Sequence, residues 1–360
     1  MRESHGGNIY LLAERLGVAE SDIIDFSASI NPLGVPESVQ AAMKEHMRHL
    51  GNYPDPDTKR LRVKISDHIG VDIDSIVCGN GSTELIYLIA RALRAGRVLI
   101  PEPTFSEYER ACGKNSGVEI VKHSLARETG FNVNPEDFIR AMEAGKSSVS
   151  RYDMIFLCNP NNPTGRLIKR EDMLRIVAAA KDLKCTLVVD EAFIDFCPGS
   201  SVADQVGNNP YLIVLRSLTK MYALSGLRVG YGVFPPLLAR AVKEAKEPWT
   251  VNTLAQIAGA VALDDKTYQS ETLRTIATGK RALEEGFSRL SISYIPSAVN
   301  YYLLHMEKAQ AAAAALRMRG ILVRDCSNFS GLDGSYLRIA VKSGLDNGRL
   351  LKEISSCPAS

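Results

Sequence analysis

The sequence predicts an α/β protein built around a mostly parallel β-sheet. Short apolar runs recur through the middle of the chain, and helical segments fit between several of them. Strands that are buried on both faces of a sheet have this continuous apolar character, and parallel strands need helical crossovers. Polar motifs also follow several of the apolar runs directly. Ligands of such sheets bind beyond the carboxyl ends of the strands, so we expect one site there.

The expected strands lie at residues 75–78, 98–100, 154–158, 186–189, 211–215 and 229–233. Apolar periodicity predicts helices over 83–94 and 170–183, between these strands.

After Pro248 the pattern changes to a long helical stretch over residues 254–290. Strands at 301–304 and 336–341 flank an alanine-rich helix at 307–319, which favours a smaller α+β region. We expect a large domain over residues 46–249 and a small domain formed by 1–45 and 250–360.

The composition is that of an ordinary globular protein. The chain has 360 residues, 45% hydrophobic and 23% charged, with a net charge of +2. This balance favours neither nucleic acid nor a membrane surface as a partner. We expect no transmembrane segment and no signal peptide, because no apolar run approaches ~18 residues and none follows the N-terminus.

The seven cysteines are scattered and form no C-x-x-C pair. We interpret them as reduced thiols of a cytoplasmic protein. Cys357 lies close to the end with no second cysteine nearby, so no metal site is indicated.

The segment Ser217-Leu218-Thr219-Lys220 is the most informative one, together with Arg228 in a glycine-flanked segment eight residues later. A lysine among small residues can form an imine with a carbonyl, and burial would free its amine to attack. The two hydroxyls and Arg228 can bind a dianionic phosphate beside it. These are the groups needed to bind pyridoxal phosphate.

Three upstream motifs offer further candidates. Gly81, Ser82 and Thr83 open a helix whose free N–H groups can bind an anion, although a capped glycine turn is common. Asp190 follows an apolar strand, where an unpaired carboxylate is costly; a helix N-cap is the alternative. Asn162 lies in a turn rich in Pro and Asn, and turn chemistry alone explains many such residues.

In this order, the motifs resemble those of fold-type I pyridoxal-phosphate enzymes of the aspartate aminotransferase superfamily, in the branch that contains histidinol-phosphate aminotransferase. The segments His5-Gly6-Gly7-Asn8, Asp25 to Gly34 and Asp190 to Phe196 resemble the threonine-phosphate decarboxylases of cobalamin biosynthesis. The resemblance runs from about His5 to about Arg349. It implies a large domain with a mostly parallel seven-stranded sheet and a smaller α+β domain.

The resemblance also implies roles around the cofactor. Lys220 would carry it, Asp190 would bond its ring nitrogen and Asn162 its phenolic oxygen, while the aromatic ring of Phe105 would stack on it. Aminotransferase relatives have a tyrosine where this chain has Phe193, and the decarboxylase branch likewise has phenylalanine. Phe105 is equally well explained as a core residue.

Tyr53 matches a tyrosine that reaches the cofactor phosphate of a neighbouring subunit. This implies a homodimer with shared active sites, although a Tyr before Pro in an extended loop needs no such role.

The substrate residues come from the two ends of the chain. The resemblance assigns the substrate α-carboxylate to Arg338 and a substrate phosphate to Arg324, with His5 and Asn31 as further phosphate ligands. A salt bridge to Asp325 is the alternative for Arg324, and a structural role is the alternative for His5.

The resemblance implies decarboxylation of L-threonine O-3-phosphate to (R)-1-amino-2-propanol O-2-phosphate, the aminopropanol precursor of cobalamin. Arg338 would choose the chemistry, because it fixes which Cα bond stands perpendicular to the cofactor ring. Histidinol-phosphate aminotransferase is the alternative, and a catalytically silent relative that only binds a ligand is a third possibility.

Overall fold

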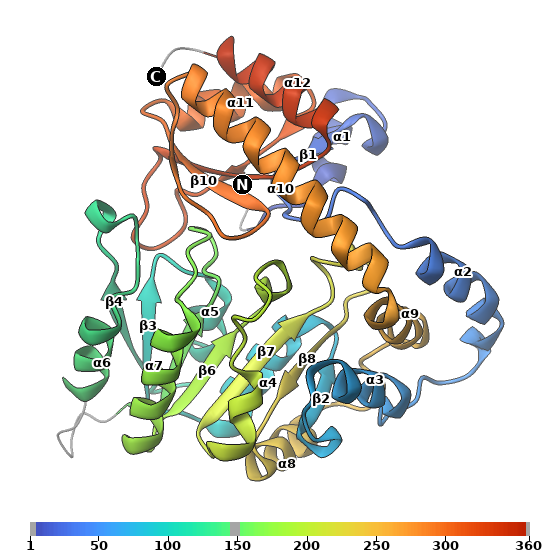
Figure 1. Ribbon diagram of the computed structural model, residues 1–360, viewed down its shortest axis with the longest axis vertical. Helices are drawn as coiled ribbons and strands as arrows, with labels where there is room; N and C mark the ends of the chain where they lie inside the picture. Colours follow the sequence, from blue (N-terminus) through green and yellow to red (C-terminus); the bar gives the residue numbers. More distant parts are fainter. Residues whose placement is uncertain (1–4, 145–151, 358–360) are drawn as a thin grey trace.

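The computed structural model describes residues 5–144 and 152–357. Its largest element is a seven-stranded sheet with strand order β2-β8-β7-β6-β5-β3-β4 (Figure 1). Only β8 runs antiparallel to its neighbours among the paired strands of this sheet. The fold class predicted from the sequence is confirmed. In chain order the strands are β2 (Ile76–Gly79), β3 (Arg97–Glu102), β4 (Glu119–Ser124), β5 (Met154–Cys158), β6 (Thr186–Asp190), β7 (Leu212–Ser217) and β8 (Gly230–Val233).

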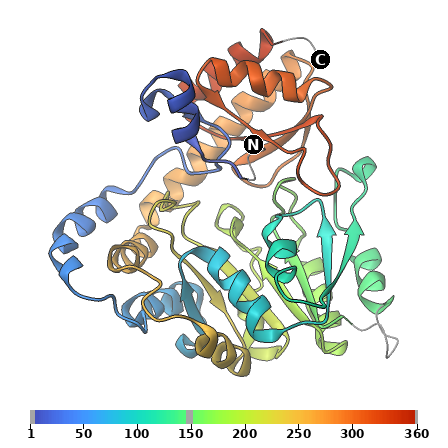
Figure 2. The same cartoon turned by 180° about the vertical axis from the view of Figure 1, so that it is seen from behind.

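The central strands are buried on both faces, as their unbroken apolar runs require. In β5, Ile155 and Leu157 join one hydrophobic cluster, while Met154 and Phe156 join the other. The second cluster includes residues of α4 (Gly81–Leu93), α5 (Glu107–Cys112) and α8 (Pro236–Ala245). The view from behind shows α4 crossing that face (Figure 2). The first cluster includes residues of α6 (Pro135–Ala144) and α7 (Arg170–Asp182).

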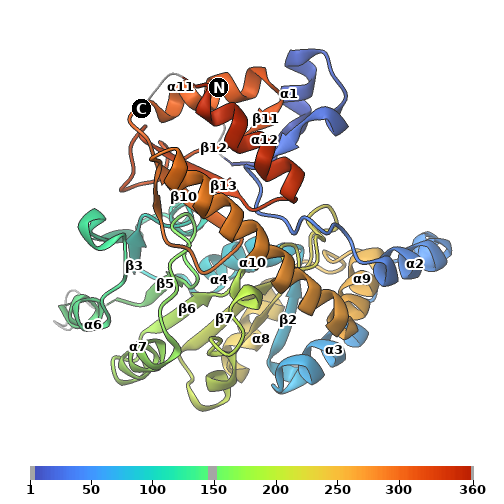
Figure 3. The same ribbon diagram turned by 45° about the horizontal axis from the view of Figure 1, so that its top comes forward.

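A second, four-stranded antiparallel sheet has the order β12-β13-β10-β9. Its strands are β9 (Ser293–Ile295), β10 (Tyr301–His305), β12 (Arg324–Asp325) and β13 (Tyr336–Ala340). The short strands β1 (Ile24–Asp25) and β11 (Ile321–Leu322) pair in parallel beside it. Helices α1 (Ile9–Leu16), α11 (Ala309–Met318) and α12 (Gly344–Ser355) surround these strands (Figure 3). The smaller α+β region is therefore present.

Two expectations about elements were wrong or incomplete. The helical stretch expected over 254–290 is two helices, α9 (Thr253–Asp264) and α10 (Lys266–Arg289). The break falls at Asp265, whose carboxylate caps α10 by accepting the Tyr268 N–H at 3.0 Å. Strand β4 was not predicted, because this edge strand is only partly buried and lacks a continuous apolar run.

The remaining elements are helices and short 3₁₀ helices. Helices α2 (Glu37–His46) and α3 (Lys59–Ile69) follow the N-terminal segment, and α10 runs from the smaller sheet towards α9 (Figure 3). Short 3₁₀ helices lie at Glu20–Asp22, Met47–Gly51, Ile73–Ser75, Arg127–Thr129, Ile194–Phe196 and Ala203–Asn208. The domain boundaries at residues 46 and 249 stay a prediction.

All seven cysteines lie within the described ranges, are buried and form no disulfide. Within the described ranges, no three acidic, His or Cys side chains cluster as metal ligands would, and no helix has the length and apolarity to cross a bilayer.

Candidate active site

A cavity of about 340 Å³ lies at the carboxyl ends of the large sheet's central parallel strands and is closed by residues of the smaller sheet. It collects side chains from the N-terminal segment, the large sheet and the C-terminal region. Thirteen of the residues singled out in the sequence line it: His5, Ser82, Thr83, Phe105, Asn162, Asp190, Phe193, Ser217, Thr219, Lys220, Arg228, Arg324 and Arg338.

Lys220 lies three residues beyond the end of β7, partly buried in this cavity. Burial, together with the nearby charges of Arg338 and Arg228, lowers the pKa of Lys220 from 10.5 to about 8. Asp190 opposes this shift only in part. Roughly a tenth of Lys220 is therefore an uncharged, nucleophilic amine at neutral pH, far more than for an ordinary lysine.

The groups expected to bind phosphate form a cradle. Ser217 Oγ and Thr219 Oγ1 are 2.7 Å apart, and both line the cavity with Arg228 and the first turn of α4. At Gly81, which has φ +73°, an added Cβ would lie 2.5 Å from Arg228 Nη2. At Gly230 an added Cβ would lie 2.6 Å from the Ser82 nitrogen. Glycine at both positions keeps the backbone close to the anion site, so the cradle fits the phosphate of pyridoxal phosphate.

Asp190 is buried at the end of β6 and faces the same cavity. Its Oδ2 accepts a hydrogen bond from the Tyr108 hydroxyl at 2.7 Å, and its Oδ1 accepts one from the Ala192 N–H at 3.0 Å. Burial raises the pKa of Asp190, and both hydrogen bonds oppose that rise. The carboxylate is thus held in position to bond a protonated ring nitrogen, which fits the cofactor.

Tyr108 was missed in the sequence. It lies three residues after Phe105, packs against it edge-on at 5.6 Å and stacks on Phe156 at 5.0 Å. The spacing of three residues between Phe105 and Tyr108 was the available signal, although Phe105 lies before the start of α5 at Glu107.

Arg338 lies on β13 opposite Arg324 on β12, so the two guanidinium groups come from paired positions of the smaller sheet. Arg338 Nη1 donates to Asn162 Oδ1, and its Nη2 donates to the Ser27 carbonyl at 2.7 Å. Its buried Nε has no acceptor among residues 5–144 and 152–357. Arg324 Nη2 donates to Asn328 Oδ1 at 2.8 Å. Two cations side by side suit a substrate with two anionic groups.

His5 reaches the cavity from the N-terminal segment. Its Nε2 lies 3.1 Å from Oε1 of Glu107, whose Oε2 accepts a hydrogen bond from the Tyr87 hydroxyl at 2.6 Å. Glu107 is buried, lines the cavity and was not singled out in the sequence, where it gave no signal beyond its place after Phe105.

The structure does not bring Asn31 to the cavity lining. Its side-chain amide donates to the Met221 carbonyl at 2.7 Å and to Thr272 Oγ1 at 2.6 Å. Its backbone N–H donates to the Lys220 carbonyl at 3.2 Å. These bonds occupy the amide, so we correct the expected role of Asn31 from a phosphate ligand to a support for the segment that carries Lys220.

Tyr53 is also outside the cavity. It is 81% exposed and packs against Trp249 with ring centroids 4.9 Å apart. Nothing within one chain brings it to the phosphate cradle, so its expected role requires a second subunit.

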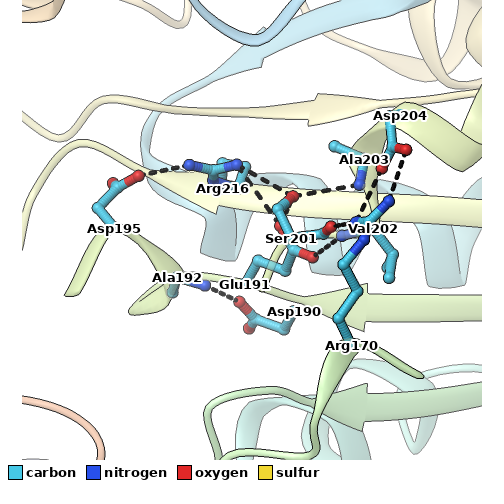
Figure 4. A network of polar contacts seen from close by, with 10 residues as sticks. All are labelled: Arg170, Asp190, Glu191, Ala192, Asp195, Ser201, Val202, Ala203, Asp204 and Arg216. Atoms are coloured by element: carbon cyan, nitrogen blue, oxygen red, sulfur yellow. Dashed lines mark hydrogen bonds and ion pairs between the residues drawn. The ribbon is translucent and has the colours of Figure 1, made fainter. Parts of the chain in front are cut away.

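A buried polar network lies directly behind the site (Figure 4). Glu191 follows Asp190, and Arg216 precedes Ser217, so both point away from the cavity. Glu191 accepts hydrogen bonds from Ser201 Oγ at 2.6 Å and from the Val202 N–H at 2.8 Å. Arg216 lies 3.5 Å from Glu191 and also bonds Asp195. The network ties together the two strand ends that present Asp190 and Ser217.

Comparison with known proteins gives consistent findings. The family model described as aminotransferase class I and II matches residues 21–354. A threonine-phosphate decarboxylase of Salmonella typhimurium is 38% identical, over 97% of this chain and 94% of that protein. Among solved structures, the histidinol-phosphate aminotransferase of Clostridium acetobutylicum has a TM-score of 0.84 at 31% identity, over 91% of this chain and 97% of that chain. The L-threonine-O-3-phosphate decarboxylase of Porphyromonas gingivalis has a TM-score of 0.79 at 28% identity, over 92% and 98%. The chain therefore belongs to the aminotransferase class I and II family, and it is an enzyme that depends on pyridoxal phosphate.

Proposed function

We propose that this enzyme decarboxylates L-threonine O-3-phosphate to (R)-1-amino-2-propanol O-2-phosphate, which supplies the aminopropanol linker of cobalamin. The observation that carries the proposal is the pairing of Arg324 and Arg338 on neighbouring strands, both lining the cavity that holds Lys220. A small substrate with a carboxylate and a phosphate matches this arrangement of charges. The similarity to the Salmonella typhimurium decarboxylase supports the same substrate.

In this proposal Lys220, Asp190, Asn162 and the phosphate cradle hold pyridoxal phosphate, and Phe105 covers its ring. The bound cofactor supplies an electron sink for negative charge that develops at the substrate Cα. Asp190 keeps the ring nitrogen protonated, and Tyr108 fixes the carboxylate that does so.

The protein's own residues then determine the outcome. Arg338 binds the substrate carboxylate through guanidinium N–H groups, and Arg324 and His5 bind the substrate phosphate. Arg338 would orient the carboxylate for loss as carbon dioxide, and the electron sink that the cofactor supplies would take up the electron pair of the Cα–carboxylate bond. The ammonium form of Lys220, which predominates at neutral pH for a pKa of about 8, would then deliver a proton to Cα.

Phe193 supports decarboxylation over transamination. It is buried, contacts Tyr301 edge-on at 5.0 Å and has Lys220 Nζ 5.7 Å above its ring. A phenylalanine cannot donate a hydrogen bond to the cofactor's phenolic oxygen, which a tyrosine at this position could do. Transamination of histidinol phosphate remains the second candidate, because the structural similarity to the Clostridium acetobutylicum aminotransferase is equally extensive.

The decisive experiment incubates the cofactor-loaded enzyme with threonine phosphate and measures carbon dioxide and the aminopropanol phosphate. Lys220→Ala, which cannot hold the cofactor covalently, is the control and should produce neither. Formation of glutamate and a keto phosphate ester from 2-oxoglutarate and histidinol phosphate, without carbon dioxide from threonine phosphate, would replace the proposal by the aminotransferase. A protein that never acquires visible absorbance near ~420 nm with added cofactor would support a silent binding protein instead.

We also propose a homodimer in which Tyr53 reaches the phosphate cradle of the partner subunit. Exposed apolar side chains accompany Tyr53 on this side of the chain, and a second copy would cover them: Met47, Leu50 and Trp249. We place the enzyme in the cytoplasm, a location that the seven cysteines without a disulfide support.

A further inference from the structure

Ser27 connects three parts of the site. Its carbonyl accepts the hydrogen bond from Arg338 Nη2 at 2.7 Å. Its hydroxyl accepts one from the Gly7 N–H at 2.7 Å and donates one to Asp25 Oδ1 at 2.6 Å. Ser27 is buried and lines the cavity. The same residue therefore contacts both the N-terminal segment and the arginine assigned to the substrate carboxylate.

The N-terminal segment lies flat against this serine. A Cβ added at Gly6 would come within 2.9 Å of both the Ser27 carbonyl carbon and Ser27 Oγ. Gly7 has φ +92°, a conformation that side chains rarely adopt. The absence of a side chain at Gly6 therefore lets the backbone approach the carbonyl that Arg338 uses, and the conformation of Gly7 places its N–H on the Ser27 hydroxyl.

The segment is also held on the opposite side of Gly6. His5 pairs with the buried carboxylate of Glu107 on α5, and Tyr87 on α4 donates to the same carboxylate. Residues 5–7 thus bridge from the helices of the large sheet to Ser27.

The Arg338 guanidinium also lies over the Tyr301 ring, 5.4 Å from the ring centroid. Among the described residues, Nη1 donates to Asn162 and Nη2 to Ser27, while Nε is buried without an acceptor. Two fixed points define the plane of a guanidinium, so a shift of the Ser27 carbonyl turns the face that is offered to a carboxylate.

We propose that Gly6, Gly7 and Ser27 are positioning residues that set the reaction specificity of the enzyme through Arg338. By packing on Ser27, the N-terminal segment holds Arg338 at the angle that presents the bond from Cα to the substrate carboxylate, rather than the bond from Cα to hydrogen, for cleavage. This inference rests on the proposed decarboxylation of threonine phosphate.

If Arg338 turns, the competing reaction becomes accessible. The Cα proton leaves in place of carbon dioxide, the amino group remains with the cofactor, and water supplies the oxygen of a 2-oxo acid. The two reactions start from the same bound substrate, so their ratio reports the orientation of the carboxylate and is independent of the amount of folded enzyme.

The test compares Gly6→Ala and Ser27→Ala with the parent enzyme, all loaded with cofactor. Gly6→Ala pushes on the Ser27 backbone, and Ser27→Ala removes the bonds to Gly7 and Asp25 while keeping the carbonyl. We expect the ratio of 2-oxo acid to carbon dioxide to rise by about tenfold in each variant. This is the change in the ratio of two competing rates when one hydrogen bond, here that of Arg338 to the Ser27 carbonyl, is lost. Gly348→Ala is the matched control, because an added Cβ there meets nothing within 4 Å, and its ratio should not change.

Two failures can be told apart. If the parent enzyme releases no carbon dioxide from threonine phosphate, the proposed function fails. If the parent does so and both variants keep its product ratio, even with lower rates, the inference is overturned, because a purely structural role would slow both reactions equally. Should Ser27→Ala not fold, Gly6→Ala alone decides.

Discussion

Replacing Arg216 by methionine tests how much the network behind the site contributes. The Arg216 side chain is 8% exposed, and the carboxylates of Glu191 and Asp195 beside it are 0% and 15% exposed. Removing the cation leaves two carboxylates in a low dielectric, which costs about 3–5 kcal/mol of unfolding free energy. Ser201 and Val202 still donate to Glu191, so we expect the lower part of that range.

The same network contains a matched control. Arg170 and Asp204 are 2.7 Å apart but are 34% and 48% exposed, and Arg170 also donates to the Ser201 carbonyl, so Arg170→Met should cost about 1–2 kcal/mol. Urea unfolding would be measured at saturating cofactor and one protein concentration, because both ligand and self-association shift apparent stability.

The pH dependence gives an independent check. Burial raises the pKa of Glu191, and Arg216 opposes that rise. Without Arg216 the pKa of Glu191 rises further. A carboxyl group with a raised pKa destabilises the folded protein at a pH above that pKa, and the penalty disappears once the pH falls below it. The deficit of Arg216→Met should therefore shrink on acidification. Equal losses for Arg216→Met and Arg170→Met would refute the assignment of a buried, mutually dependent charge network.

Three other predictions concern the site. The lowered pKa of Lys220 predicts how fast the cofactor-free protein binds pyridoxal phosphate at each pH. The rate should rise about tenfold per pH unit up to pH 8 and stay constant above it. A rate, followed by stopped-flow absorbance, that keeps rising towards pH 10 would contradict this. Tyr108→Phe removes a buried hydrogen bond to the Asp190 carboxylate and should reduce kcat about tenfold, with a weaker affinity for the cofactor in equilibrium dialysis and little change in KM. Mixed dimers of Tyr53→Phe and Lys220→Ala chains should contain one site with both substitutions and one with neither, so activity should recover towards half of the parent's; no recovery on mixing would argue against shared sites.

Much of the fold was accessible from the sequence because the central strands are unbroken apolar runs. Residues 154–158 were predicted as a strand and form β5 with those bounds. The break at Asp265 was missed because apolar periodicity continues through it, although an Asp before a helical segment is a known N-cap signal. Edge strand β4 alternates irregularly between exposed and partly buried residues, so its pattern resembles a loop.

The site was accessible in part, for a related reason. Lys220, Asp190 and Ser217 each follow or end a strand, and parallel strands bring such positions to one edge. Glu107 and Ser27 act through partners that are distant in sequence, which no local pattern encodes. Asn31 carries the right chemistry, but its amide is bonded to the segment beyond Lys220, a fact that only the packing of α10 reveals.

The alternation along β6 and β7 has a consequence for how these strands can vary. Asp190 and Ser217 face the cofactor cavity, while their immediate neighbours Glu191 and Arg216 face the hidden charge cluster. A deletion or insertion of one residue in either strand would exchange the side chains that face the two sides. In β7 the Arg216 guanidinium would then face the cofactor and the Ser217 hydroxyl would face the charge network. In β6 the Glu191 carboxylate would take the place of Asp190. Insertions and deletions are therefore compatible with activity in the surface connections but not in these two strands. Their ends present cofactor-binding side chains on one face and the side chains of the stabilising charge network on the other.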